Sequence, residues 1–168
     1  MTRIAIVDPQ PAIRAGLAVL LRGEPGLVPV GAAAGASDAQ DLLARERPDV
    51  VLMEPSLLDG DGIALCSRLT AQPRAPRVIL YTARPGDDVE LLARVAGASG
   101  LVDKAAAPDA LFEAIRRVAR VSGGSAMSPR ATRRMASNSS SGAAALSTRP
   151  LAPATRASNS TSSPGRAV

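Results

Sequence analysis

Four polar side chains in this sequence each follow a short apolar run. The carboxylates of Asp8 and Glu54, the hydroxyl of Thr82 and the ammonium of Lys104 occupy these positions. If the runs are strands of one parallel sheet, all four side chains lie at its carboxyl edge, where open α/β proteins keep their ligands and their chemistry. Lysine is a compact point charge that pairs with a carboxylate or contacts a phosphoryl oxygen.

Glu54 and Lys104 are the most informative members of this set. Glu54 comes directly after the apolar run 50–53 and before a turn rich in Gly, Pro and Asp, which is typical of a buried strand and its exit. Lys104 is the only lysine among 20 basic residues. A surface lysine placed by chance is the alternative explanation for Lys104, and the sequence by itself leaves both open.

The surrounding pattern predicts the elements that bring these residues together. Short apolar runs alternate with amphipathic segments of about ten residues, which favours a doubly wound parallel sheet with right-handed crossovers. We expect strands at residues 3–7, 27–31, 50–53, 77–81 and 101–103, and helices beginning near residues 11, 37, 62, 87 and 108.

Several single residues carry local expectations. Pro29 marks its strand as an edge strand. The spacing of residues 37–40 resembles a capping box that opens the second helix. Asp61 is expected to cap the third helix, and Asp59 to be a solvated turn acid. Cys66 is expected to be a small buried residue of the third helix rather than a redox sensor.

Composition excludes several classes of function. The chain has no His and a single Cys, which removes Ser-His and Cys-His catalysis and an internal disulfide and argues against zinc binding. Only Tyr81 and Phe112 are aromatic, too few for a base-stacking nucleic-acid platform. No apolar run approaches the roughly 18–20 residues of a membrane span, and the first strand begins too early for a signal peptide. We therefore expect a cytoplasmic protein.

Charge divides the chain into unlike parts. Residues 1–113 carry a net charge of −4, whereas residues 114–168 contain nine Arg and no acid. Residues 136–168 are almost entirely Ala, Ser, Thr, Asn, Gly, Pro and Arg, which predicts a disordered tail. We predict an α/β domain over residues 1–122, a basic linker or helix extension over 123–135, and the tail over 136–168.

Five segments of the chain, in order and with the right spacing, resemble the receiver domain of response regulators. They are residues 6–11, 48–54, 61–62, 80–82 and 97–104. The Gly-Ala-Ser-Gly turn at 97–100 and the junction at 128–130 look most like the branch with a LuxR-type helix-turn-helix output. The resemblance implies a flavodoxin-like (βα)5 fold with strand order 2-1-3-4-5. No pattern for a helix-turn-helix follows residue 135.

In that family an Asp at the exit of the third strand accepts a phosphoryl group from a histidine kinase, and acids at the first strand hold Mg²⁺. The resemblance assigns phosphoryl binding to Thr82 and Lys104, and an acidic pocket to Asp8. It also implies a weak or lost Mg²⁺ site formed by Asp8, Glu54 and the Ser56 carbonyl.

Three positions depart from the family pattern. Glu54 replaces the phosphoacceptor Asp, Pro9 replaces the second metal-binding acid, and Leu101 replaces the aromatic switch residue. Glu54 reaches farther and can pair directly with Lys104. At a partly open edge such a pair is worth about 1 kcal/mol or less.

These departures predict a degenerate, non-enzymatic receiver that regulates transcription indirectly, through protein contacts and without phosphorylation of Glu54. The expected partner is a histidine kinase, another response regulator or a second copy, with no cofactor beyond residual Mg²⁺. Two alternatives remain: a phospho-receiver that uses another acid, and a regulator that binds nucleic acid weakly and non-specifically through its basic tail.

Overall fold

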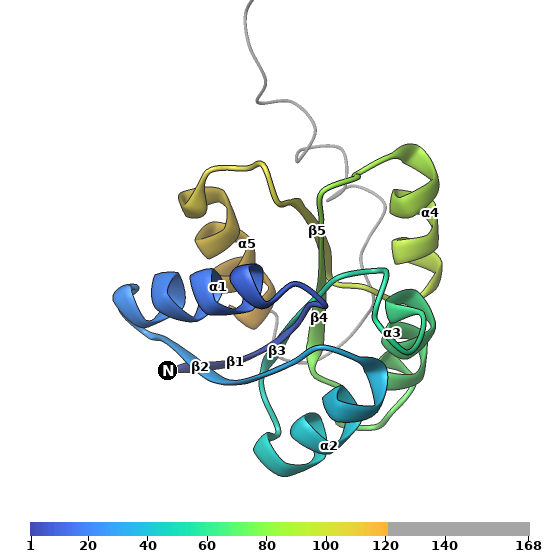
Figure 1. The fold of residues 1–168 in the computed structure, drawn as a ribbon, viewed down its shortest axis with the longest axis horizontal. Coiled ribbons are helices and arrows are strands. Elements are labelled where there is room, and N and C mark those ends of the chain that lie inside the picture. The colour runs from blue at the N-terminus through green and yellow to red at the C-terminus, as the bar shows by residue number, and fades with distance from the viewer. Residues whose placement is uncertain (121–168) are drawn as a thin grey trace, which may run out of the picture. The chain divides into compact units, whose positions relative to one another are not determined.

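A computed structural model describes residues 1–120 as a five-stranded parallel sheet flanked by five helices, with strand order β2-β1-β3-β4-β5 (Figure 1). The predicted fold class and strand order are confirmed. The expected linker and tail, residues 123–168, lie outside the described residues. The elements are β1 (Thr2–Val7), α1 (Pro11–Gly23), β2 (Leu27–Ala33), α2 (Ala36–Glu46), β3 (Val50–Met53), α3 (Gly62–Thr70), β4 (Arg77–Thr82), α4 (Asp87–Val95), β5 (Gly100–Asp103) and α5 (Pro108–Arg120).

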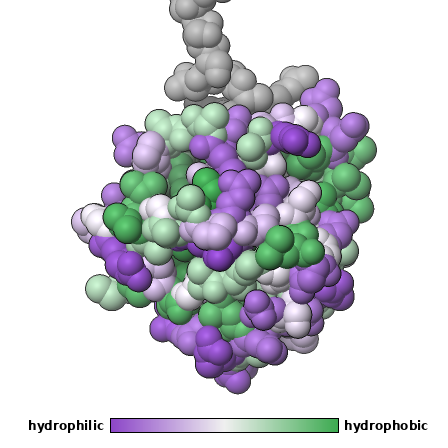
Figure 2. Space-filling model, in the orientation of Figure 1, coloured by the Kyte–Doolittle hydropathy of each residue, from purple (hydrophilic) through white to green (hydrophobic). Residues whose placement is uncertain are grey.

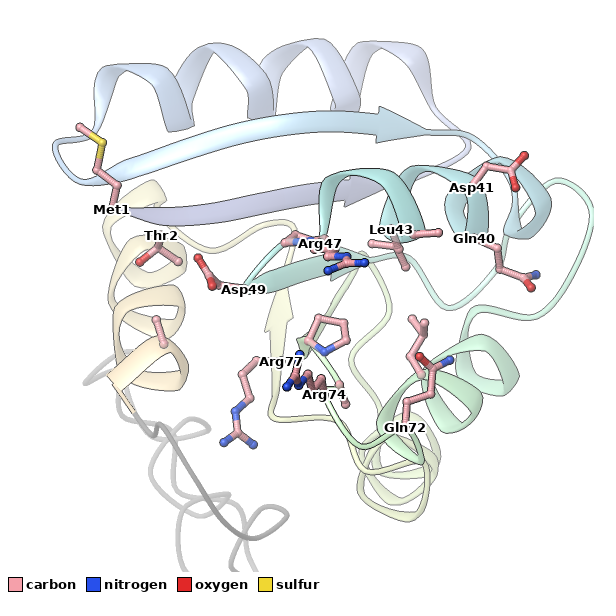
Figure 3. A pocket seen from close by; sticks show the side chains of 16 residues that line it. Met1, Thr2, Gln40, Asp41, Leu43, Arg47, Asp49, Gln72, Arg74 and Arg77 are labelled. Carbon is pink, nitrogen blue, oxygen red and sulfur yellow. The ribbon is translucent and has the colours of Figure 1, made fainter.

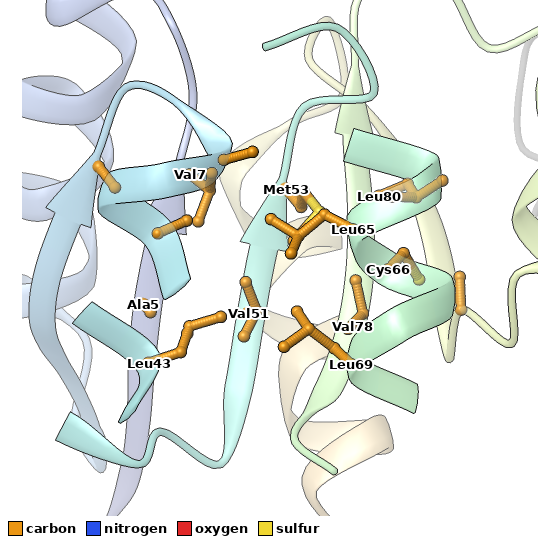
Figure 4. Close-up of a cluster of buried hydrophobic side chains, with 14 of the residues drawn as sticks. Ala5, Val7, Leu43, Val51, Met53, Leu65, Cys66, Leu69, Val78 and Leu80 are labelled. Atoms are coloured by element: carbon orange, nitrogen blue, oxygen red, sulfur yellow. The ribbon is translucent and has the colours of Figure 1, made fainter. Parts of the chain in front are cut away.

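The sheet separates two apolar layers. Helices α2, α3 and α4 cover one face, where Val51 and Met53 point, and α1 and α5 cover the other, where Val50 and Leu52 point (Figures 1 and 4). All four residues of β3 are buried, since neighbouring residues of a strand face opposite sides and both sides are covered. This explains why β3 reads as a continuous apolar run.

Strand β2 lies at the edge of the sheet, as Pro29 predicts. Pro29 pairs with Ile4 of β1, and the register shifts immediately afterwards, so that Ala5 pairs with Gly31. Proline has no N–H to donate. It is tolerated in an edge strand because no neighbouring strand lies on the outer side to accept such a hydrogen bond.

The register of the strands aligns their carboxyl ends. Met53 of β3 pairs with Val7 on one side and with Leu80 on the other. The ladder continues one residue past the strands, because the Glu54 N–H donates to the Val7 carbonyl at 2.9 Å and the Lys104 N–H donates to the Thr82 carbonyl at 2.8 Å. Backbone pairing therefore fixes where the charged side chains begin.

The capping of α2 differs from the prediction. The helix begins at Ala36 rather than Ser37, and its N-cap residue is Gly35, which has no side chain to accept a capping hydrogen bond. Instead Asp59, from the loop after β3, accepts hydrogen bonds from the Ala36 N–H and, at 3.0 Å, from the Ser37 N–H. Asp59 is exposed to solvent, as predicted, but its carboxylate also caps a helix. A cap from 22 residues away leaves no local sequence signal.

Other local predictions are confirmed. The Asp61 carboxylate caps α3 by accepting from the Ile63 N–H at 2.7 Å. Cys66 lies fully buried on α3, and burial raises the pKa of its thiol to about 12. A thiol that stays protonated is a poor nucleophile, as expected of a packing residue. Within residues 1–120 no helix is long and apolar enough to cross a membrane.

The cap from Asp59 generates a pH-dependent prediction. Hydrogen bonds from Ser37 and then Ala36 hold the pKa of the Asp59 carboxyl below its usual range. Because the folded-state pKa is depressed, the ionised carboxylate stabilises the folded domain fully at a pH above its unfolded-state pKa, about 3.9. This stabilisation is lost as the pH falls through the folded-state pKa. Asp59→Asn should lower the urea midpoint at pH 7, and its difference from the parent should fade in acid. Asp41 is an exposed acid of α2, and Asp41→Asn should leave the urea midpoint unchanged at pH 7 and in acid. An equal fall in the urea midpoint of both variants would contradict the cap.

Two glycines generate an opposite pair of predictions. A methyl group at Gly16 in α1 meets no atom within 4 Å, whereas one at Gly62 meets the Glu54 carbonyl oxygen. Gly16→Ala should stabilise the domain by about 0.5–1 kcal/mol, because Gly is unfavourable inside a helix. Gly62→Ala should destabilise it by about 1–3 kcal/mol through overpacking. Urea unfolding measures both, and a neutral Gly62→Ala would show that the loop relaxes freely.

Candidate functional site

Lys104 joins the two carboxylates at the carboxyl edge of the sheet. Its Nζ lies 2.5 Å from Asp8 Oδ2 and 2.6 Å from Glu54 Oε2. The side chains of Lys104, Asp8 and Glu54 are only 8%, 2% and 13% exposed. The edge is therefore more closed than the sequence suggests, and the predicted contact between Glu54 and Lys104 is present together with a second one.

Hydrogen bonds fix each carboxylate in place. Thr82 Oγ1 donates to Glu54 Oε1 at 3.3 Å. Asp8 Oδ1 accepts from the Gln10 N–H at 2.8 Å, while Arg14 donates to the Asp8 carbonyl at 2.7 Å. The structure thus brings together all four residues that the sequence singles out, and it connects them through Lys104 and Thr82.

The two carboxylates keep Lys104 charged. Partial burial by itself lowers the pKa of the Lys104 ammonium, but hydrogen bonds and charge attraction from Asp8 and Glu54 outweigh it and leave the pKa above its ordinary value. The charge of a buried cation is well compensated by two carboxylates. The buried charge of Asp8 or Glu54 would be uncompensated if Lys104 were removed. The cluster carries two negative charges and one positive charge.

Tyr81 is a neighbour of this cluster that sequence reasoning missed. Lys104 Nζ lies 5.8 Å from the centroid of its ring, within the range of a cation–π contact. Burial raises the pKa of the Tyr81 hydroxyl, and the charge of Lys104 offsets part of that rise. Its place just before Thr82 gave no signal of this contact, because it depends on the position of β5 beside β4.

The remaining predicted residues stand outside the ion network. Ser56 is exposed and forms an isolated bridge with Asp61. Leu101 is half-buried and packs against the apolar layer under α2, α3 and α4. Asp103, which precedes Lys104 in the sequence, also lies outside the network, and its carboxylate accepts from the Ala105 N–H at 2.8 Å. The switch role of Leu101 and the metal role of Ser56 stay predictions.

The donor set at this edge does not fit a Mg²⁺ site well. Mg²⁺ requires near-octahedral oxygen ligands. Here Pro9 offers no side-chain ligand, and the Asp8 and Glu54 carboxylates each give one oxygen to Lys104. Within residues 1–120 no cluster of three or more acidic, His or Cys side chains is placed to hold a metal ion.

A cavity of about 1200 Å³ lies elsewhere, at the end of the sheet where the strands begin. It opens beside Thr2, Asp49 and Arg77 at the beginnings of β1, β3 and β4 (Figure 3). Neither Lys104 nor any of its partners lines it. The charged cluster is therefore the candidate site on chemical grounds and is separate from this hollow.

Comparison with known proteins agrees with this geometry. Residues 4–116 match the family model of the response regulator receiver domain. The chain is 36% identical over 104 residues to the DNA-binding transcriptional activator DevR/DosR of Mycobacterium tuberculosis, covering 62% of this chain and 48% of the relative. It is 34% identical over 115 residues to the transcriptional activator protein ExaE of Pseudomonas putida, covering 68% and 54%.

Solved structures give the same result. A LuxR-family two-component response regulator from Aurantimonas sp. SI85-9A1 superimposes with a TM-score of 0.68 at 35% identity, covering 77% of this chain and 91% of that one. The chain spans about half the length of the curated relatives it matches. Sheet order, edge residues and family match coincide, and the chain belongs to the response regulator receiver domain family of two-component signalling.

Proposed function

We propose that this receiver domain works without phosphorylation at Glu54, and that it regulates transcription indirectly through contacts with other signalling proteins. The observation that carries the proposal is the Lys104 ammonium, which contacts the carboxylates of Asp8 and Glu54 at once. Negative charge thus already stands at the edge of the sheet where the family places a phosphoryl group. The domain has no catalytic role of its own in this proposal.

Phosphoryl transfer is mostly positioning and charge neutralisation. Glu54 carries its carboxylate about one bond length farther than Asp, and its two oxygens are held by Lys104 and Thr82. A misplacement near 1 Å costs on the order of 10²-fold in a positioned reaction. Pro9 removes a ligand for the metal that neutralises the transferring group, so we propose that Mg²⁺ binds weakly or not at all.

The alternative acids are engaged elsewhere. Asp59 caps α2 and Asp61 caps α3, and both carboxylates accept backbone N–H groups. A carboxylate that holds a helix terminus is a poor candidate for a displaced phosphoacceptor, because phosphorylation would break the cap. This favours phosphorylation-independent action over a phospho-receiver that uses another acid.

The partner is proposed by class only. Receiver domains meet histidine kinases or other signalling proteins, and two of the relatives are named transcriptional activators. The nucleic-acid alternative rests on the nine Arg of residues 114–168, six of which lie outside the described part of the chain. Contact of that kind would be non-specific and sensitive to salt.

Phosphodonor chemistry tests the proposal directly. Incubation of the full chain with Mg²⁺ and acetyl phosphate, followed by intact mass measurement, should show no added phosphoryl group. The variant Glu54→Asp with Pro9→Asp regains the family's acid set and should gain one. Phosphorylation of the parent chain would sink the proposal. Failure of the folded variant to react would show that Glu54 and Pro9 are not what prevents the reaction.

Removal of the bridging cation tests the charge cluster. Lys104→Met leaves Asp8 and Glu54 close together without a counter-charge, and should destabilise the domain by about 3 kcal/mol, the low end for breaking a buried pair. Adding Glu54→Gln to Lys104→Met should recover part of the loss, because one uncompensated charge disappears. Urea unfolding at pH 7 measures both, and additive losses in the double variant would argue against the bridge.

The pH dependence of that loss has a definite sign. The folded-state pKa of Lys104 is raised, so its contribution is complete below the unfolded value, about 10.4, and declines as the pH rises through the folded value. The difference between parent and Lys104→Met should therefore be constant between pH 7 and 9.

A further inference from the structure

The cavity at the end of the sheet where the strands begin lies apart from the charged cluster. We call it the arginine hollow, because Arg47, Arg74 and Arg77 all line it (Figure 3). Its volume of about 1200 Å³ exceeds the roughly 300–1,000 Å³ of a typical site for a small molecule. The space suits a segment of polypeptide better than a single small molecule.

Arg47 has a backbone conformation that its side chain makes unfavourable. It follows the last residue of α2 with a φ of 45°, and within residues 1–120 it is the one non-glycine residue with a positive φ. Glycine is favoured where a helix ends in this conformation, because a Cβ is unfavourable there. Such strain is found at functional sites. Among the described residues the Arg47 guanidinium has no hydrogen-bond or ion-pair partner, so an internal contact does not explain the arginine.

Arg74 lies in a tight turn between α3 and β4. The Ala75 N–H donates to the Gln72 carbonyl at 3.2 Å, which places Pro73 and Arg74 at the two corners of the turn. Proline favours the first of these corners and restricts the segment to few conformations. The Arg74 side chain is exposed and forms no hydrogen bond or ion pair within residues 1–120. A rigid turn therefore presents a second guanidinium that no internal contact uses.

The helix ends nearby do not account for both arginines. The carbonyl ends of α2 and α3 lie at this end of the domain, and a cation near such an end is favourable. The last turn of α2 already carries Arg45, and the last turn of α3 carries Arg68. Neither of these lines the arginine hollow. Arg47 and Arg74 are thus additional positive charges, and both line one cavity.

The rest of the lining decides which anionic occupant fits. Asp41 is an exposed acid of the hollow, and Asp49 accepts a hydrogen bond from the Arg3 N–H at 2.8 Å. Leu43 and Leu69 add apolar surface. A polyphosphate carries acceptors only, so Asp41 would repel it. A polypeptide segment offers backbone N–H donors and apolar side chains as well as carboxylates, and it therefore matches this mixed lining.

We propose that the arginine hollow is a docking site for an acidic segment of another protein. Carboxylates of the segment pair with Arg47 and Arg74, and its apolar side chains contact Leu43 and Leu69. Residues 121–168 of this chain are a poor occupant, because they contain six Arg and no acid. The ion pairs are open to solvent, so the contact is weak and sensitive to salt. The proposal does not depend on whether Glu54 is phosphorylated.

A phage-displayed library of random short peptides tests the proposal. Peptides are selected on the immobilised full chain and then counter-selected on the variant Arg47→Gly with Arg74→Gln. This variant keeps every Arg of residues 121–168, so peptides that bind only those residues are removed. The remaining sequences should be enriched in Asp and Glu and should contain apolar residues. If no sequence distinguishes the two proteins, or if the distinguishing sequences are not acidic, the proposal is overturned.

Fluorescence anisotropy of a labelled, selected peptide measures the share of each arginine. Arg47→Gly and Arg74→Gln should each raise the Kd by about fivefold, the upper range for an exposed ion pair. Arg22→Gln and Arg68→Gln remove exposed arginines outside the hollow and should leave the Kd unchanged. Equal weakening in all four variants would show that only the overall charge matters, which overturns the docking site.

Two further measurements separate docking from the other roles of these arginines. Tripolyphosphate should displace the peptide no better than chloride at equal ionic strength, and stoichiometric displacement would assign the hollow to a small polyanion instead. Arg47→Gly should unfold at a urea concentration equal to or above that of the parent, because glycine adopts the left-handed conformation without penalty. A lower urea midpoint together with unchanged peptide binding would show that Arg47 serves the end of α2 alone, and would overturn its docking role.

Discussion

The bridge from Lys104 to Asp8 and Glu54 is the interaction on which the candidate site depends. Lys104 follows β5 at one side of the sheet, Asp8 follows β1, and Glu54 follows β3. Two largely buried carboxylates would repel each other without a cation between them. The ammonium removes that repulsion and holds the ends of three strands together. The same contact gives the carboxylates a partner at the place where the family uses a metal and a phosphoryl group.

Helix caps connect this edge to the rest of the domain. The loop after Glu54 returns to the body of the domain through the Gly62 N–H, which donates to the Pro55 carbonyl at 2.8 Å. The same loop caps α3 with Asp61 and α2 with Asp59. A change in the position of Glu54 would therefore be felt at two helix termini. The acids that a displaced phosphorylation site would need already serve as structural partners, which limits the chemistry open to this edge.

Charge and apolar surface are divided between two regions of the domain. The carboxyl edge concentrates charge that is satisfied internally, whereas α4 exposes the large apolar side chains of Leu91, Leu92 and Val95 (Figure 2). Under the proposed function the domain acts through its surface. The large apolar side chains exposed on α4 are typical of an interaction surface.

The alternation of apolar runs and amphipathic segments determined the fold class and the edge where Asp8, Glu54, Thr82 and Lys104 meet. These follow from periodicity and from the rule that parallel strands end together, whereas the strand order was implied only by the resemblance to receiver domains. Only the tertiary structure decided the cap of α2 by Asp59, the contact of Lys104 with Tyr81, and the burial of the ion cluster. Each of these joins residues far apart in the sequence, and local patterns carry no information on such contacts. The outward direction of Leu91, Leu92 and Val95 on α4 was likewise decided by packing, because it depends on which face of the helix meets the rest of the domain.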